Sequence, residues 1–223
     1  MSDLVQQIQQ LLPALLEQTG ITLWLVAASL VIGGFAGLVL GTAVYVTRRG
    51  GVLEQPLVYW VLNIVVNTFR PVPFIILLAA LQPVARATIG TGLGNDMAIF
   101  AISIAATFGI ARIVEQNLVS VDPGVVEAAR AMGAGPWRII ATVILPEAFG
   151  PLVLGYTFAV VAIIDMSAVA GIIGGEGVGN YAIAYGFRQF DPVVTWSALV
   201  IIVIVVQIVQ ALGNLLARRI LRR

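Results

Sequence analysis

Five long apolar stretches constrain this chain more than any other feature of its sequence. Hydrophobic residues make up 60% of the chain and charged residues 10%, and the mean hydropathy is +1.02. A helix needs about 20 apolar residues to cross a bilayer, where only helices and closed barrels satisfy their own backbone hydrogen bonds. The sequence therefore predicts an all-α, polytopic membrane helix bundle with five transmembrane helices. These helices are expected near residues 23–46, 57–81, 97–119, 148–173 and 193–216.

Residue types that are missing narrow the chemistry. The chain has no Cys and no His, and all twelve of its basic residues are Arg. Thiolate or imidazole metal sites, disulfides and imidazole proton transfer are thereby excluded. Without Lys the chain cannot form a phosphate-binding P-loop. We therefore expect no metal, no cofactor and no catalysis in this chain, so any ATP and Mg²⁺ would be bound by another polypeptide. A net charge of +1 gives no reason to expect a nucleic-acid partner.

The distribution of arginine predicts how the chain is oriented. Arginine is enriched in loops on the cytoplasmic side of membrane proteins. Eight arginines fall on one side of the predicted spans and two on the other, which places the N-terminus outside and the C-terminus in the cytoplasm. Arg70 and Arg112 lie inside spans. The cytoplasmic group is Arg48, Arg49, Arg130, Arg138, Arg218, Arg219, Arg222 and Arg223, and the outer pair is Arg86 and Arg188.

Two short terminal segments flank the predicted membrane domain, residues 21–217. Residues 1–20 alternate Leu and Gln at roughly helical spacing and lack a basic start. This pattern argues against a cleaved signal peptide. It favours a short amphipathic helix, interrupted by Pro13, on the extracytoplasmic surface of the membrane that the chain spans. Residues 218–223 form a basic cytoplasmic tail.

The longest predicted cytoplasmic connection covers residues 120–146. Asp122-Pro123 is a strong helix start, since an N-cap acceptor precedes proline at the first helical position. Gly133 and Gly135 can end this helix near Met132. Pro136 restarts a second short helix, and the chain then enters the fourth span. The pattern predicts two short helices joined at a glycine elbow.

The first of these helices presents small residues, which favours docking into a groove of another protein. Ala128, Ala129 and Gly133 leave a low-relief surface, while Glu127 and Arg130 offer polar contacts. The alternative is a helix that lies on lipid without a partner.

The same segment carries a family pattern. Glu127-Ala128-Ala129 is followed after three residues by Gly133 and after nine more by Val143-Ile144-Leu145-Pro146. This arrangement resembles the EAA motif of ABC-importer permeases. Further blocks, within a resemblance that runs from about residue 22 to the C-terminus, are similar to the methionine-importer branch. These blocks are residues 66–78, 111–115, 167–171 and 185–190.

The resemblance implies a type I ABC-importer permease fold in the bacterial inner membrane. It implies that two copies of the chain pair with two cytoplasmic ATPase subunits and receive methionine from an extracytoplasmic binding protein, with lipid around them. The EAA-type loop would be the coupling helix, which sits in a cleft of the ATPase. The coupling residues would be Glu127, Ala128, Ala129, Gly133, Leu145 and Pro146.

Ionisable residues inside spans are functional candidates because each costs at least about 2.5 kcal/mol at a span's centre. Arg70 lies in the second span beside Pro71 and Pro73, which free backbone carbonyls. It is either a gate residue on the path or an arginine that reaches the headgroups. Arg112 and Glu115, three residues apart, favour a structural ion pair.

Asp165 and Met166 depart from the methionine-permease pattern of a small residue followed by an aromatic one. An acid that faces the path could bind a substrate ammonium group, and a thioether could favour a thioether substrate. Asp165 could equally pair with Arg70 or Arg112, or bind water. The candidate path residues are Asn67, Arg70, Pro71, Asp165, Met166 and Ser167.

Four other readings bound the interpretation. Residues 174–179 resemble a dinucleotide-binding turn but follow a span without a strand, so a flexible outer loop or hinge is expected, in which Glu176 departs from the family's glycine. The importer could instead carry another amino acid or small solute. An ion-coupled secondary transporter would usually show internal repeats, and none is visible. An intramembrane aspartyl enzyme would need a second acid beside Asp165.

Overall fold

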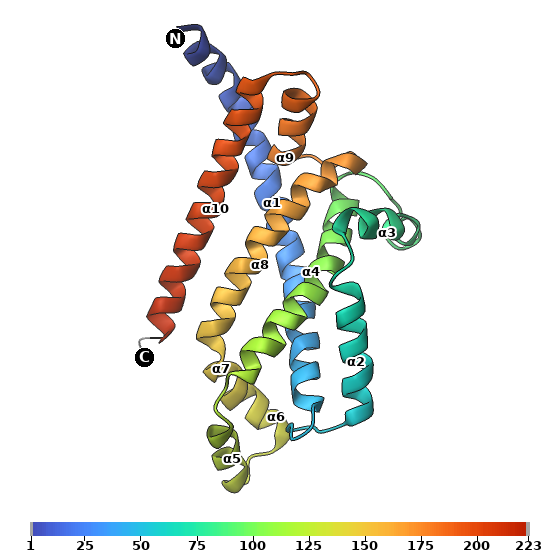
Figure 1. Cartoon of the computed structure of the whole chain (residues 1–223), viewed down its shortest axis with the longest axis vertical. Coiled ribbons are helices and arrows are strands. Elements are labelled where there is room, and N and C mark those ends of the chain that lie inside the picture. Colours follow the sequence, from blue (N-terminus) through green and yellow to red (C-terminus); the bar gives the residue numbers. More distant parts are fainter. Residues whose placement is uncertain (1, 222–223) are drawn as a thin grey trace. The chain divides into compact units, whose positions relative to one another are not determined.

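The computed structural model describes residues 2–221, and every regular element in that range is a helix (Figure 1). Four helices there are long and apolar enough to cross a membrane, and α2 and α3 add a fifth span if that bent pair is counted as one. The helices that form these spans are α1 (Ser2–Thr47), α2 (Pro56–Phe69), α3 (Phe74–Thr88), α4 (Gly94–Val119), α8 (Phe149–Val169) and α10 (Pro192–Leu221).

The first helix differs from the expectation at its N-terminal end. We expected a separate short helix over residues 1–20, but the described part of that segment is the beginning of α1, which continues through Pro13. Packing explains the continuity, because Leu15 is buried against Val178 and Ala198. In addition, the Gln7 amide donates to a carboxylate oxygen of Asp191 at 3.1 Å.

The second span is broken where the two prolines predicted a break. Helix α2 ends at Phe69, and α3 begins at Phe74, directly after Pro73. Helix α3 continues to Thr88 and carries Arg86 in its last turn, so this arginine lies in a helix and not in a loop after residue 81 as expected. The helix continues because Ala85 is fully buried in a cluster with Leu78.

The chain divides into two compact units. The first comprises residues 1–32, 73–104 and 160–210, and the second comprises residues 33–72, 105–159 and 211–223. In the first unit, Leu78 and Met97 centre one apolar cluster, and Leu15 centres another. In the second unit, Val44, Val66 and Ala111 pack together, and the rings of Phe69 and Phe108 stack with centroids 5.0 Å apart. Arg222 and Arg223 of the predicted basic tail lie outside the described residues.

The segment after α8, for which we expected a flexible outer loop or a hinge, is held by hydrogen bonds within the first unit. A 3-10 turn, η2 (Ala170–Ile173), ends at Gly174, and helix α9 (Val178–Tyr181) follows. Three consecutive backbone N–H groups donate to side chains of other helices at 2.8–2.9 Å: Glu176 to Asn95, Gly177 to Gln18 and Val178 to Thr22. We call residues 174–178 the pinned turn.

Candidate functional site

Helix α5 (Pro123–Ala131) begins as its sequence predicts. Asp122 is the N-cap, and its Oδ1 accepts a hydrogen bond from the Gly124 amide at 2.8 Å. Pro123 occupies the first helical position, where a missing N–H costs nothing. The helix is therefore defined locally before it makes any tertiary contact.

A left-handed glycine ends this helix. Gly133 has φ +79°, and a Cβ built on it would meet no atom within 4 Å. The amide of Ala134 donates to the Ala129 carbonyl at 3.0 Å, which closes the turn. The predicted glycine elbow is thus present, and the space around it is open. We call residues 132–135 the open elbow.

The second short helix starts at Pro136, as predicted, but it does not end before the fourth span. Helix α6 (Pro136–Ile139) passes into a π-helical turn, η1 (Ile140–Ile144), and then into α7 (Leu145–Glu147) just before α8. Ile139, Ile140 and Ile144 are all buried, which anchors this run. Figure 1 shows α5 and α6 folded back on each other, with α7 leading into the start of α8.

One face of α5 and the elbow is open in the chain. Glu127, Ala128 and Ala131 are exposed, whereas Ala129 is buried and holds the helix in place. Two large apolar side chains extend this face, with Met132 81% and Trp137 75% exposed. Small residues allow close approach of another surface, and exposed large apolar groups are typical of an interaction site. We call this set the docking face. Of the other proposed coupling residues, Leu145 is half-buried and Pro146 is exposed.

Arg130 makes a contact that the sequence did not predict. We expected it to offer a polar contact to a partner, but its Nη2 donates to the Gly51 carbonyl at 2.9 Å. Gly51 lies in the loop between α1 and α2, and a Cβ there would clash with the Val46 carbonyl oxygen. The bond joins α5 to this loop across 79 residues of sequence, a separation at which no local pattern signals a contact.

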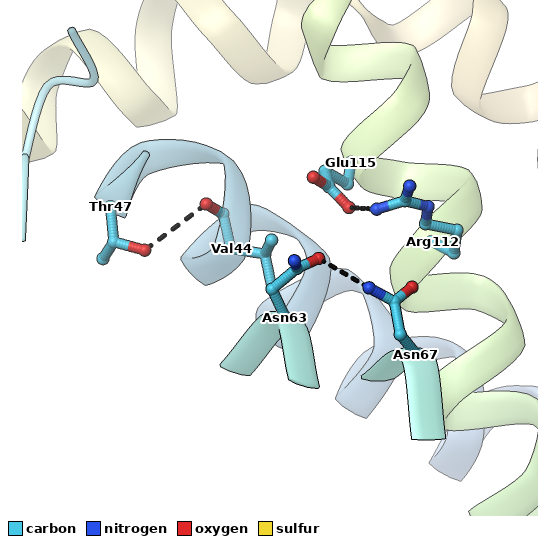
Figure 2. A network of polar contacts seen from close by, with 6 residues as sticks. All are labelled: Val44, Thr47, Asn63, Asn67, Arg112 and Glu115. Carbon is cyan, nitrogen blue, oxygen red and sulfur yellow. Dashed lines mark hydrogen bonds and ion pairs between the residues drawn. The ribbon is translucent and has the colours of Figure 1, made fainter. Parts of the chain in front are cut away.

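The candidate path residues of the second unit lie toward the end of α2. Asn67 is exposed, and its amide donates to Asn63 Oδ1 at 3.0 Å (Figure 2). Arg70 is the exposed C-cap residue of α2, and its amide donates to the Val66 carbonyl at 3.0 Å. Pro71 is also exposed. These three residues are therefore accessible to another molecule in the single chain.

Arg112 and Glu115 lie on α4 and point toward each other (Figure 2). Arg112 Nη1 lies 2.6 Å from Glu115 Oε2, and their side chains are 29% and 10% exposed. This is the pair that the i, i+3 spacing predicts. It is the one ion pair among residues 6–7 and 9–221, whose side chains the structure describes, so Arg112 is already engaged and Asp165 makes no such contact there.

The three candidates on α8 divide by burial. Asp165 is exposed, Met166 is half-buried and Ser167 is 5% exposed. The Ser167 hydroxyl donates to the Ile164 carbonyl at 2.7 Å. Asp165 is therefore the residue of this trio that is open to a neighbour, whereas Ser167 packs inside the chain.

Known proteins resemble this chain over most of its length. A family model described as "Binding-protein-dependent transport system inner membrane component" matches residues 33–222. A probable D-methionine transport system permease protein, MetI, of Vibrio cholerae is 39% identical over 92% of each chain. The protein of the same name from Pasteurella multocida is 42% identical over 82% of this chain and 84% of its own. In structure, the chain matches the MetNI methionine ABC transporter, solved in inward-facing conformations. The TM-score is 0.85 at 34% sequence identity, covering 96% of this chain and 98% of the other.

Proposed function

This chain belongs to the family of binding-protein-dependent transport system inner membrane components, and we propose that it forms the membrane path of an ABC importer for methionine. The predicted all-α type I ABC-importer permease fold is confirmed by the structural match. The assignment of methionine as the substrate rests on the similarity to methionine permeases, at 39% identity over 92% of the chain.

The proposed assembly has two copies of this chain, two ATPase subunits and an extracytoplasmic binding protein. The N-terminus lies outside and the C-terminus in the cytoplasm, which puts the open elbow on the side where ATP is available. The ATPase binds ATP and Mg²⁺, since this chain has no Lys for a P-loop. The open docking face supports this assignment, because it combines small residues with Met132 and Trp137.

The proposed mechanism couples ATPase closure to the membrane helices through α5. A clasped α5 moves with the ATPase, and two connections transmit the motion. One is the continuous run of α6, η1 and α7 into α8, and the other is the Arg130–Gly51 hydrogen bond to the loop before α2. Because Asn67, Arg70 and Pro71 follow at the end of α2, motion of that loop reaches the proposed path.

Transport of a different amino acid is the second candidate, and Asp165 is the observation that favours it. This exposed carboxylate stands where the methionine-permease pattern has a small residue, and it can bind the ammonium group of any amino acid. In a two-copy assembly each chain contributes one such acid.

The test is to purify the chain with its co-expressed ATPase, reconstitute both in liposomes and add the binding protein. We expect methionine to stimulate ATP hydrolysis and to be taken up. Stimulation by another amino acid and not by methionine would overturn the assignment of methionine as the substrate. The absence of an associated ATPase would overturn the assignment of the chain to an ABC importer.

A matched pair of glycine variants tests the docking face. Gly133→Trp places a large ring at the open elbow, and we expect ATPase association to be lost while the chain still inserts. Gly90→Trp is the control, because Gly90 has φ +80° and also has no atom within 4 Å of a built Cβ. If both variants retain the ATPase equally, docking at the elbow is wrong.

A further inference from the structure

A pocket with a volume of 480 Å³ lies between the end of α1 and the beginning of α2. All of its lining residues belong to the second unit. None of its lining residues belongs to the docking face or to the proposed path residues, although they flank the loop that Arg130 contacts. The lining residues are Arg48, Arg49, Pro56, Tyr59 and Trp60.

The charge at this pocket is positive and not neutralised. The Arg48 guanidinium is fixed, since its Cζ lies 4.1 Å from the centroid of the Tyr45 ring. Arg49 is exposed, and neither arginine has an ion-pair partner among the side chains of residues 6–7 and 9–221. The acidic group of this loop, Glu54, accepts a hydrogen bond from the Gly50 amide at 3.0 Å. With Arg130 bound to the same loop, the surroundings keep an excess of cations over anions.

An apolar strip leads away from the pocket along α2. Trp60 is 62% exposed and Leu57 75% exposed, and Val61 and Ile64 follow on the same helix at 47% and 43%. Their i, i+3, i+4 and i+7 spacing puts them on one side of the helix. The pocket therefore has a cationic end with tyrosine and tryptophan, followed by an apolar strip within a predicted span.

We propose that this pocket binds an anionic phospholipid of the leaflet that meets the α1–α2 loop. The headgroup phosphate contacts the Arg48 and Arg49 guanidinium groups, for which an anionic oxygen is the natural ligand. Trp60 and Tyr59 lie at the level where aromatic rings favour the membrane interface. One acyl chain follows Leu57, Val61 and Ile64 along α2. A soluble anion could use only the cationic end, so the strip is what favours a lipid.

The experiment is native mass spectrometry of the full chain in detergent with added phosphatidylglycerol or phosphatidylcholine of identical acyl chains. We expect one phosphatidylglycerol to be retained per chain in preference to phosphatidylcholine. A basic residue at an anionic surface contributes about fivefold in affinity. Replacing both arginines, R48Q with R49Q, should weaken the binding of phosphatidylglycerol by about 25-fold.

The control replaces two other exposed basic residues, R218Q with R219Q, which lie at the end of α10 and should leave retention unchanged. Trp60→Ala keeps both arginines, and therefore the charges that orient the chain in the membrane. It should also weaken the binding of phosphatidylglycerol. Equal retention of the two lipids, or full retention by the R48Q with R49Q variant, would overturn the site. Binding of inorganic phosphate as tightly as phosphatidylglycerol would also overturn it, because the strip would then contribute nothing.

Discussion

The open elbow and the pinned turn are both built on left-handed glycines, yet they are surrounded in opposite ways. Gly133 has φ +79° and no atom within 4 Å of a built Cβ. Gly177 has φ +117°, and a Cβ there would lie 2.6 Å from Thr22 Oγ1. The elbow leaves Met132 exposed, whereas in the pinned turn three backbone amides are bound to side chains from α1 and α4.

This difference shows how one backbone device serves two purposes. At the elbow, glycine reverses the chain and leaves a surface free for another molecule. At the turn, glycine lets the backbone approach α1 closely enough for Thr22 and Gln18 to satisfy buried amides. The exposed surface at the open elbow indicates a site for a partner. The hydrogen-bonded backbone of the pinned turn indicates a rigid part of the transporter.

The largest expected effect compares alanine at the two glycines. Gly177→Ala combines a backbone conformation that is nearly restricted to glycine with a steric clash, and it should lower the free energy of unfolding by about 3 kcal/mol. Gly133→Ala introduces only the strain of a left-handed backbone, and it should lower the free energy of unfolding by about 1 kcal/mol. Denaturant titration in detergent measures both. Equal losses would remove the distinction between the two regions.

A smaller effect is expected when one fastening of the pinned turn is removed. Thr22→Val keeps the shape of the side chain but leaves the buried Val178 amide without its acceptor, which costs about 1–3 kcal/mol. Thr88→Val is the control, because the Thr88 hydroxyl is exposed and bonds only within its own helix. Hydrogen exchange at Val178 should accelerate in Thr22→Val alone. Unchanged exchange there would show that the bond does not hold the turn.

The smallest effect on stability is expected on the elbow side. Arg130→Gln removes the charged donor to the Gly51 carbonyl, and the exposed position limits the loss in unfolding free energy to about 1 kcal/mol. Methionine uptake should fall by more than the loss of folded protein explains, while the ATPase still co-purifies. If uptake per folded transporter is unchanged, the bond does not transmit motion.

The sequence alone predicted most of the features that local rules control. The N-cap at Asp122, the glycine turn at Gly133 and the restart at Pro136 follow from the conformational preferences of neighbouring residues. The break after Arg70 follows from two prolines. Motif spacing likewise indicates the family, and hydropathy indicates the all-α fold. The comparisons confirm both.

Contacts between distant residues could not be predicted in this way. The Arg130–Gly51 bond and the acceptors of the pinned turn join helices that are far apart in sequence. The continuity of α1 through Pro13 depends on packing of Leu15, which no local propensity reports. Burial of Ser167 beside exposed Asp165 requires the rotation of α8 to be known, which a uniformly apolar helix does not reveal.

The central claim, that the docking face contacts the ATPase, is tested most directly by site-specific photocrosslinking. The chain has no cysteine, so Met132→Cys and Phe187→Cys each provide one attachment point for a photoreactive maleimide. Both side chains are exposed, at 81% and 73%. We expect a crosslink to the co-purified ATPase from residue 132 and none from residue 187. A crosslink from residue 187 without one from residue 132 would contradict the claim.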